Sequence, residues 1–190
     1  MDTPEQQQII ISGVGGQGVL FITRLLAEAA INKGMPVITS ETHGMAQRGG
    51  TVVSHLKVGD FNSPLIRPAQ ADGLIALKAE SVTAHGAYVR DGGWIVANNT
   101  GTLDHETTGA VLTIDAEDTA RQINNLRAIN LIMLGFAISG LPSAKRGAEM
   151  LFCSLADIQT VLEKRLAHKQ TLRDSALEAL AAGARTERLE

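Results

Sequence analysis

Short apolar runs alternate with amphipathic segments along most of the chain. Ile9, Ile10 and Ile11 form a continuous apolar run before a glycine, which is typical of a strand buried on both faces of a parallel sheet. Apolar residues then recur at helical spacing from Gly18 until Gly34, a residue type that commonly ends helices. The same patterns predict further strands at 36–40, 51–58, 73–77, 94–98 and 111–114, and helices at 79–90, 130–139 and 172–180, with one more capped by Ser154.

This alternation of strands and helices predicts the fold class. We expect a three-layer, Rossmann-like α/β domain with a mostly parallel sheet and a helical C-terminal segment. Neither an internal repeat nor a linker divides the sequence, so residues 1–190 are expected to form a single domain. From Ala181 onward the residues are small and charged, and we expect this tail to fray.

Composition excludes several classes of function. Lys and Arg number 17 and Asp and Glu 20, giving a net charge of −3, so neither nucleic acid nor a membrane is indicated as a partner. The one cysteine, Cys153, cannot supply a disulfide or a thiolate cluster by itself, and we expect it to be a buried, inert thiol. The histidines show no metal-binding spacing and are expected at the surface, so no metal site is predicted. An acidic, polar start to the chain favours a cytoplasmic protein.

A glycine-rich turn follows the first predicted strand and precedes the first predicted helix. Its residues, Gly13-Val14-Gly15-Gly16-Gln17-Gly18, match G-x-G-x-x-G, in which backbone amides approach a phosphate at a helix N-terminus. Glu41 lies near the end of the second strand, where a dinucleotide-binding fold has its ribose-binding acid, although the spacing exceeds the usual count of about 20 residues. Packing alone also explains such a turn. The candidate cofactor-binding residues are Gly13, Gly15, Gly16, Gln17 and Gly18.

A polar loop is predicted at 42–50, after the second strand. The carboxyl ends of strands in open α/β sheets bind ligands, so the loop is expected near the glycine turn. Arg48 suits a carboxylate or a phosphate, and long polar loops in compact domains tend to be functional, although a solvated loop is the alternative. The candidate residues of an active-site or subunit-junction loop are Glu41, His43, Gln47, Arg48 and Gly49.

Two sequence strings carry a resemblance to a known family. The glycine turn with Val19-Leu20, followed by residues 41–50 (ETHGMAQRGG), resembles the gamma-type subunit of the 2-oxoacid:ferredoxin oxidoreductases. Within that family the strings are most similar to the beta subunit of the indolepyruvate branch. The similarity continues through residues 63–66, 71–77 and 130–135 and so covers the chain to about Leu141.

The resemblance implies an accessory subunit of an oxidoreductase that decarboxylates a 2-oxoacid, of indolepyruvate or aryl-pyruvate type, to an acyl-CoA and reduces ferredoxin. Thiamine diphosphate and the iron–sulfur clusters would then belong to a large partner subunit, in agreement with the single cysteine here. Coenzyme A is the ligand implied for the glycine turn, and no cofactor is assigned to this chain alone. No catalytic residue is assigned, and the isolated chain is expected to be inactive and able to self-associate as a homodimer.

Two alternatives remain open on the sequence. The glycine turn and Glu41 also fit a stand-alone Rossmann-type nucleotide-binding protein. A structural interaction domain with an empty turn is the other alternative.

Overall fold

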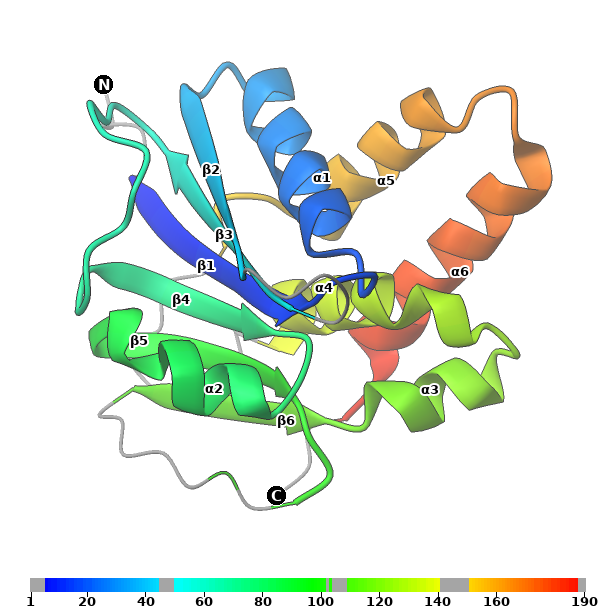
Figure 1. Cartoon of the computed structure of the whole chain (residues 1–190). Coiled ribbons are helices and arrows are strands. Elements are labelled where there is room, and N and C mark those ends of the chain that lie inside the picture. The colour runs from blue at the N-terminus through cyan, green and yellow to red at the C-terminus, as the bar shows by residue number, and fades with distance from the viewer. Residues whose placement is uncertain (1–5, 45–49, 102, 104–108, 141–150, 188–190) are drawn as a thin grey trace.

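A computed structural model describes residues 6–44, 50–101, 103, 109–140 and 151–187. Within these ranges six strands form one sheet in the order β2-β3-β1-β4-β5-β6 (Figure 1). The strands are β1 (Gln7–Val14), β2 (Val37–His43), β3 (Thr51–Val58), β4 (Ala71–Ala76), β5 (Val89–Asn98) and β6 (Ala110–Ile114).

The sheet is mostly parallel, with one exception. β1, β4, β5 and β6 pair in parallel, whereas β3 is antiparallel to both β1 and β2. The short connection between β2 and β3 explains the exception, because only an antiparallel strand can return directly after a hairpin-length loop. The expected α/β fold and mostly parallel sheet are therefore confirmed, and β3 was not foreseen as an antiparallel strand between β1 and β2.

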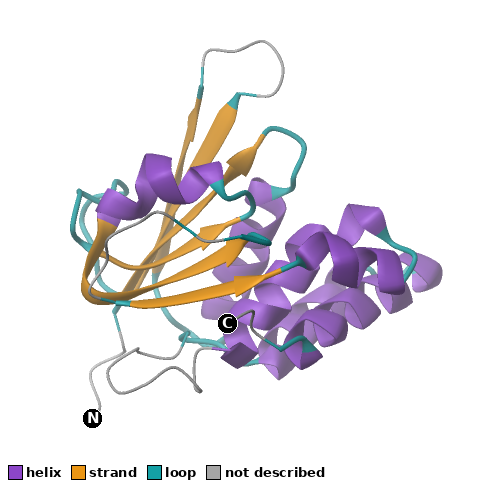
Figure 2. Ribbon diagram, turned by 90° about the horizontal axis from the view of Figure 1, so that it is seen from below, coloured by secondary structure: helices purple, strands orange, loops and turns teal. Residues whose placement is uncertain are grey.

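The two faces of the sheet are covered unequally. Figure 2 shows most helices gathered on one side, while the short helix α2 lies on the other. The described helices are α1 (Val19–Asn32), α2 (Glu80–His85), α3 (Ala116–Gln122), α4 (Ile129–Gly140), α5 (Leu155–Arg165) and α6 (Gln170–Arg185), with short 3-10 turns η1 (Gly86–Tyr88) and η2 (Leu126–Ala128).

The apolar run in β1 contributes to both faces. Ile9 and Ile11 belong to the core beneath α1 and α4–α6, and Ile10 belongs to the smaller core on the α2 side. All three side chains are fully buried. The continuous run is thus explained by a central strand with a core on each side, as the sequence predicted.

Two glycines allow α4 and α6 to cross closely. A Cβ atom at Gly135 would overlap the Leu180 carbonyl, and one at Gly183 would overlap the Ile132 carbonyl. The helices therefore touch backbone to backbone at this crossing, which any larger residue would separate. Such contact is sensitive to a single added methyl group because protein interiors are close-packed.

Two sequence expectations on the helices were wrong. The helix expected at 79–90 is only α2, after which η1 and the start of β5 at Val89 take up the remainder. The tail does not fray from Ala181: α6 continues to Arg185, and Ala182 is buried against its neighbours. Small residues there serve close packing rather than disorder. The expected cap at Ser154 is confirmed, because its hydroxyl and Asp157 form a capping box on α5.

Candidate functional site

The glycine turn joins β1 to α1 at the carboxyl edge of the parallel strands. Gly16 (φ 96°) and Gly18 (φ 85°) adopt left-handed backbone conformations that side chains disfavour. Gly18 also precedes the first residue of α1 and offers no side-chain cap. The predicted strand–turn–helix arrangement is therefore present, with glycine required at two positions by the backbone alone.

The glycines of the turn serve two different purposes. A Cβ at Gly13 would lie 3.1 Å from Leu77 Cβ, and one at Gly18 would overlap the Asn130 side chain. Gly15 and Gly16 are exposed instead: a Cβ at Gly15 would meet only the Gly50 carbonyl at 3.7 Å, and one at Gly16 would meet nothing within 4 Å. Packing accounts for the first pair, whereas the second pair leaves room for a ligand to approach the backbone.

Gln17 ties the turn to the neighbouring strand. Its side-chain Oε1 accepts a hydrogen bond from Val14 N–H at 2.7 Å, and its Nε2 donates to the Leu77 carbonyl at 3.4 Å. Asn98 Nδ2 donates to the same carbonyl at 3.4 Å, and its Oδ1 accepts from Ala116 N–H at 3.0 Å. These amides link the carboxyl ends of β1, β4 and β5 to the start of α3, so the Gln17 side chain already has partners within the protein.

Two residues at this edge of the sheet were not predicted as site residues. Asn98 carries no motif, and only the sheet order brings it to Leu77. Asn130 lies in the first turn of α4, where its Oδ1 accepts from Leu131 N–H at 2.8 Å. Its side chain also fills the space above Gly18. α4 therefore begins against the glycine turn, which gives Asn130 a positioning role at this site.

The C-terminal end of the polar loop contacts the glycine turn. Gly15 N–H donates to the Gly50 carbonyl at 3.0 Å, and Gly44 N–H donates to the Thr51 carbonyl at 2.8 Å. Gly50, the last residue of the second string that carried the family resemblance, thus lies against the glycine turn. Gln47, Arg48 and Gly49 lie outside the described residues.

The second strand is longer and farther from the turn than the sequence suggested. β2 continues to His43, which pairs with Val52, so the loop does not begin at residue 42 and Glu41 does not end the strand. Glu41 is exposed and pairs with Ser54 of β3, which in turn pairs with Ile11 of β1. One strand therefore separates Glu41 from β1, an order unlike that of a dinucleotide fold, in which the first two strands are neighbours.

The electrostatics of the turn favour an anion. The first turn of α1 carries no acidic side chain, and the positive end of the helix dipole points at the turn. Within the described ranges no acceptor is recorded for the N–H groups of Gly16 and Gly18. Two backbone donors at a helix N-terminus suit a phosphate or a carboxylate.

Two histidines lie on the α2 side of the sheet, His55 buried and His85 half-buried, so the expectation that the histidines lie at the surface was wrong for His55. His55 is 4% exposed, and its Nδ1 accepts from Ile66 N–H at 3.2 Å. His85 Nδ1 lies 3.0 Å from Ser12 Oγ, directly before the glycine turn. Burial lowers the pKa of both imidazoles, with His85 and Lys57 adding to the effect on His55, so both favour the neutral form.

The thiol of Cys153 is unsuited to nucleophilic chemistry. The residue is buried, and burial raises the pKa of its thiol to about 12, with a further contribution from Asp157. A thiol with such a pKa stays protonated near neutrality and is a poor nucleophile. In the described part of the chain, no three His, Cys, Asp or Glu side chains are grouped so as to hold a metal ion.

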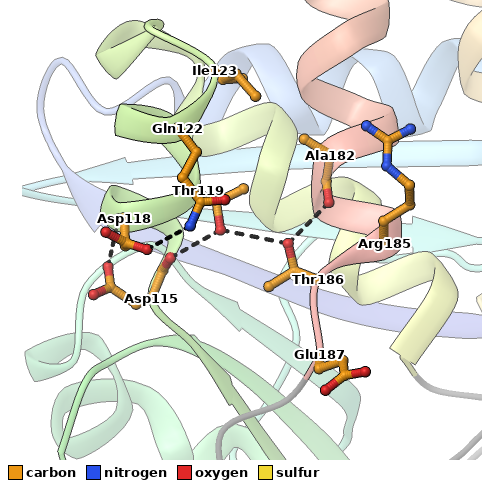
Figure 3. A pocket seen from close by; sticks show the side chains of 9 residues that line it. All are labelled: Asp115, Asp118, Thr119, Gln122, Ile123, Ala182, Arg185, Thr186 and Glu187. Atoms are coloured by element: carbon orange, nitrogen blue, oxygen red, sulfur yellow. Dashed lines mark hydrogen bonds between the residues drawn. The ribbon is translucent and has the colours of Figure 1, made fainter.

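A hollow lies between α3 and the end of α6, and several of the polar side chains that line it are paired with one another or with the backbone (Figure 3). Asp115 Oδ1 accepts from Asp118 N–H at 2.7 Å, and Asp118 Oδ2 accepts from Gln122 Nε2 at 2.8 Å. Thr119 and Thr186 each donate to a carbonyl of their own helix. These four side chains therefore cap and join the two helices, while Arg185 and Glu187 add two charged groups to the lining.

Fold and site together define a Rossmann-like α/β protein with an anion-suited glycine turn at the carboxyl edge of its parallel strands. None of the described helices has the length and apolar character needed to cross a membrane. Residues 8–186 match the family model described as pyruvate ferredoxin/flavodoxin oxidoreductase, and the chain belongs to this family. The resemblance that the two strings suggested is therefore confirmed, and with it the assignment of the chain as an oxidoreductase subunit.

Individual relatives refine this assignment. The indolepyruvate oxidoreductase subunit IorB of Archaeoglobus fulgidus is 31% identical over 147 residues, which are 67% of this chain and 73% of that protein. Among solved structures, pyruvate oxidoreductase subunit PORC of Thermotoga maritima has a TM-score of 0.78 at 22% identity, covering 98% of this chain and 99% of that one. The 2-oxoglutarate:ferredoxin oxidoreductase of Magnetococcus marinus, solved with 2-oxoglutarate, coenzyme A and succinyl-CoA, has a TM-score of 0.73 at 20% identity; this chain covers 30% of that longer one.

Proposed function

We propose that this chain is the accessory subunit of an indolepyruvate-type 2-oxoacid:ferredoxin oxidoreductase. In the proposed complex, a large partner subunit holds thiamine diphosphate and the iron–sulfur clusters, and electrons from the decarboxylated 2-oxoacid pass to ferredoxin. The similarity to IorB over two thirds of the chain supports the indolepyruvate branch. The single cysteine supports the division of labour, because one thiolate cannot hold an iron–sulfur cluster.

Within this complex the glycine turn would bind a phosphate group of coenzyme A. The observation that carries this assignment is the pair of exposed glycines, Gly15 and Gly16, beside the acid-free N-terminus of α1. The backbone N–H groups of Gly16 and Gly18 would donate to the phosphate. Binding of coenzyme A by the Magnetococcus marinus enzyme, whose chain includes a part with this fold, supports the choice of ligand. Glu41 and His43, with Gln47, Arg48 and Gly49 of the polar loop, would face the junction with the large subunit.

The complex can be tested by producing the large subunit with and without this chain. We expect a stable heteromer whose indolepyruvate-dependent reduction of ferredoxin requires both chains and coenzyme A. A large subunit that reaches the full rate alone would contradict the proposed contribution of this chain.

The turn can be tested in the same complex with Gly15→Ala. The Cβ fits the fold, since its nearest contact is 3.7 Å away, but it stands where a ligand would approach the backbone. We expect KM for coenzyme A to rise about fivefold with kcat nearly unchanged, the pattern of weakened ligand binding. Gly101→Ala is the matched control, because a Cβ there meets nothing within 4 Å and lies outside the turn. An unchanged KM in Gly15→Ala would exclude the turn as the coenzyme A site.

Calorimetry on the isolated chain separates this proposal from the two alternatives. Tight binding of NAD, NADP or FAD would favour a stand-alone nucleotide-binding protein, which the separation of Glu41 from β1 by one strand disfavours. Firm complex formation with no affinity for any of these ligands or for coenzyme A would favour a structural interaction domain.

A further inference from the structure

β2 is an edge strand with a neighbour on one side only. It pairs with β3 and stands at the end of the sheet order, so no strand lies against its outer edge in the part of the chain that the structure describes (Figure 1). Its register with β3 is continuous over the seven residues from Val37 to His43. A regular edge of this length is a template for a further strand, because its outward backbone donors and acceptors are unpaired.

The hydrogen bonds at the two ends of β2 show which of its residues face outward. Gly59 N–H donates to the Pro36 carbonyl at 2.8 Å, and Gly44 N–H donates to the Thr51 carbonyl at 2.8 Å. In an antiparallel pair such bonds recur at every second residue, so the even-numbered residues of β2 bond to β3. The odd-numbered residues therefore turn their backbone N–H and carbonyl groups away from the sheet. They are Val37, Thr39, Glu41 and His43.

The residues of β2 do not protect this edge. Natural edge strands are commonly blunted by proline, lysine or a β-bulge, and Val37–His43 contains none of these. Thr39 and Glu41 are exposed, and no hydrogen bond to their outward backbone groups is recorded among the described residues. The opposite edge strand, β6, has only five residues. The edge of β2 is therefore the one better suited to pair with a further strand.

A second copy of β2 fits this edge at full length. A twofold axis through Ser40, perpendicular to the sheet, places Val37 opposite His43 of the second copy and Thr39 opposite Glu41 of the second copy. Both members of each pair face outward, as an antiparallel ladder requires. This match at full overlap arises because β2 has an odd number of residues and both of its end residues face outward. A strand of even length would bring outward-facing residues opposite inward-facing ones.

The charges and the faces of the sheet agree with this register. Glu41 is the acidic side chain of β2, and it lies opposite Thr39 of the second copy rather than opposite its own equivalent. Like charges directly opposite one another would be destabilising. The axis also preserves the two faces of the sheet, so α1, which packs against β2, lies over the same face in both copies. The strand is therefore its own complement in length, hydrogen bonding and charge.

We propose that two copies of this chain pair through β2, antiparallel and about a twofold axis at Ser40, to form one continuous sheet. The pairing does not depend on the proposed enzymatic role, because it uses backbone groups of β2 and not the glycine turn. One pair of strands buries less area than a tight protein–protein interface, so the dimer should dissociate with a Kd on the order of 10 micromolar.

The first test is a disulfide across the axis. In the proposed register Ser40 lies opposite its own equivalent as a non-hydrogen-bonded pair, with Cα atoms about 4.5 Å apart, a separation that a disulfide spans. The full chain carrying Ser40→Cys should therefore form a covalent dimer in oxidised glutathione. Thr42→Cys is the matched control on the same face of β2, because its two Cα atoms would be about 13 Å apart along the strands. Cys153 does not compete, because it is buried.

The second test is sedimentation equilibrium of the reduced full chain, in which the mean mass should rise with concentration toward that of a dimer. Thr39→Pro removes an outward N–H that β3 does not use, and it should weaken dimerisation about tenfold. Thr39→Ala keeps this N–H and should dimerise nearly as well as the unchanged chain.

Three results would overturn the proposal. They are a chain that stays monomeric up to about 1 mM, a dimer that persists in Thr39→Pro, and equal cross-linking of Ser40→Cys and Thr42→Cys. If Thr39→Pro unfolds, the two cysteine variants decide. An edge reserved for a strand of the large subunit would give the first of these results, whether or not the two subunits form an active complex.

Discussion

The two faces of the sheet are built on different principles. The face under α1 and α4–α6 is almost entirely apolar, and its helices approach so closely that Gly135 and Gly183 touch neighbouring backbone. The face under α2 has a smaller core and also buries His55 and Lys57. The first face derives its stability from close packing, whereas the second also depends on the charge state of its side chains.

The largest effect is expected on the helical face, at the crossing of α4 and α6. Gly183→Ala should destabilise the protein by about 3 kcal/mol, because its Cβ would overlap the Ile132 carbonyl. Helix propensity alone would stabilise the variant by about 1 kcal/mol, so a loss reports the packing. Urea denaturation measures this change in the free energy of unfolding. Glu178→Ala, on an exposed position of α6, is the control and should change stability by less than about 0.5 kcal/mol. An unchanged midpoint in Gly183→Ala would contradict the close crossing.

A smaller effect is expected at the glycine turn, where both faces meet the edge of the sheet. Gly18→Ala combines a left-handed φ with an overlap onto Asn130 and should cost about 2 kcal/mol. Gly16→Ala has the same backbone strain in open space and should cost about 1 kcal/mol. Adding Asn130→Ala to Gly18→Ala should restore the difference in unfolding free energy between the two glycine variants, as measured by urea denaturation. If the two glycine variants were equally stable, Asn130 would not constrain the turn.

The α2 face should make stability depend on pH. The folded-state pKa values of His55 and His85 are lowered, so below about pH 6.5 the unfolded chain binds protons that the folded chain does not. Stability should therefore fall as the pH is lowered from 7 to 5, by less than either glycine effect. Urea midpoints measured across this range should depend less on pH in His55→Gln/His85→Gln, whereas His168→Gln, at an exposed histidine, should leave the dependence as it is. A pH dependence unchanged in the double variant would assign the protons to other groups.

The smallest effect is expected at the outer surface of the helical face. Arg165 of α5 pairs with Glu28 of α1, and both side chains are more than a third exposed. Glu28→Gln should change stability by less than about 0.5 kcal/mol in urea denaturation, and salt should reduce even this difference. A larger loss would show that this face depends on surface charge as well as on packing.

Much of the fold could be predicted from local sequence. The apolar run of β1, the helix after Gly18 and the cap at Ser154 follow from periodicity and from residue types with few conformational options. The errors fell where tertiary contacts override those preferences. Residues 79–90 divide into α2, η1 and the start of β5, and α6 continues beyond Ala181 because Gly183 packs against α4.

The candidate site divides in the same way. The glycine turn was visible as a motif, but nothing in the motif distinguishes Gly13 and Gly18, which packing requires, from Gly15 and Gly16, which are open. No sequence pattern indicated a role for Asn98, because its hydrogen bond to the Leu77 carbonyl joins two strands that are neighbours only in the folded sheet.

The sequence by itself determined the α/β class, the position of the glycine turn and the family, because these depend on patterns of neighbouring residues. Only the tertiary structure decided that β3 lies between β1 and β2, that Glu41 is therefore one strand removed from β1, and that His55 and Lys57 are buried. Strand order and burial result from contacts between residues far apart in the chain. No local stretch of sequence determines the free energy of those contacts.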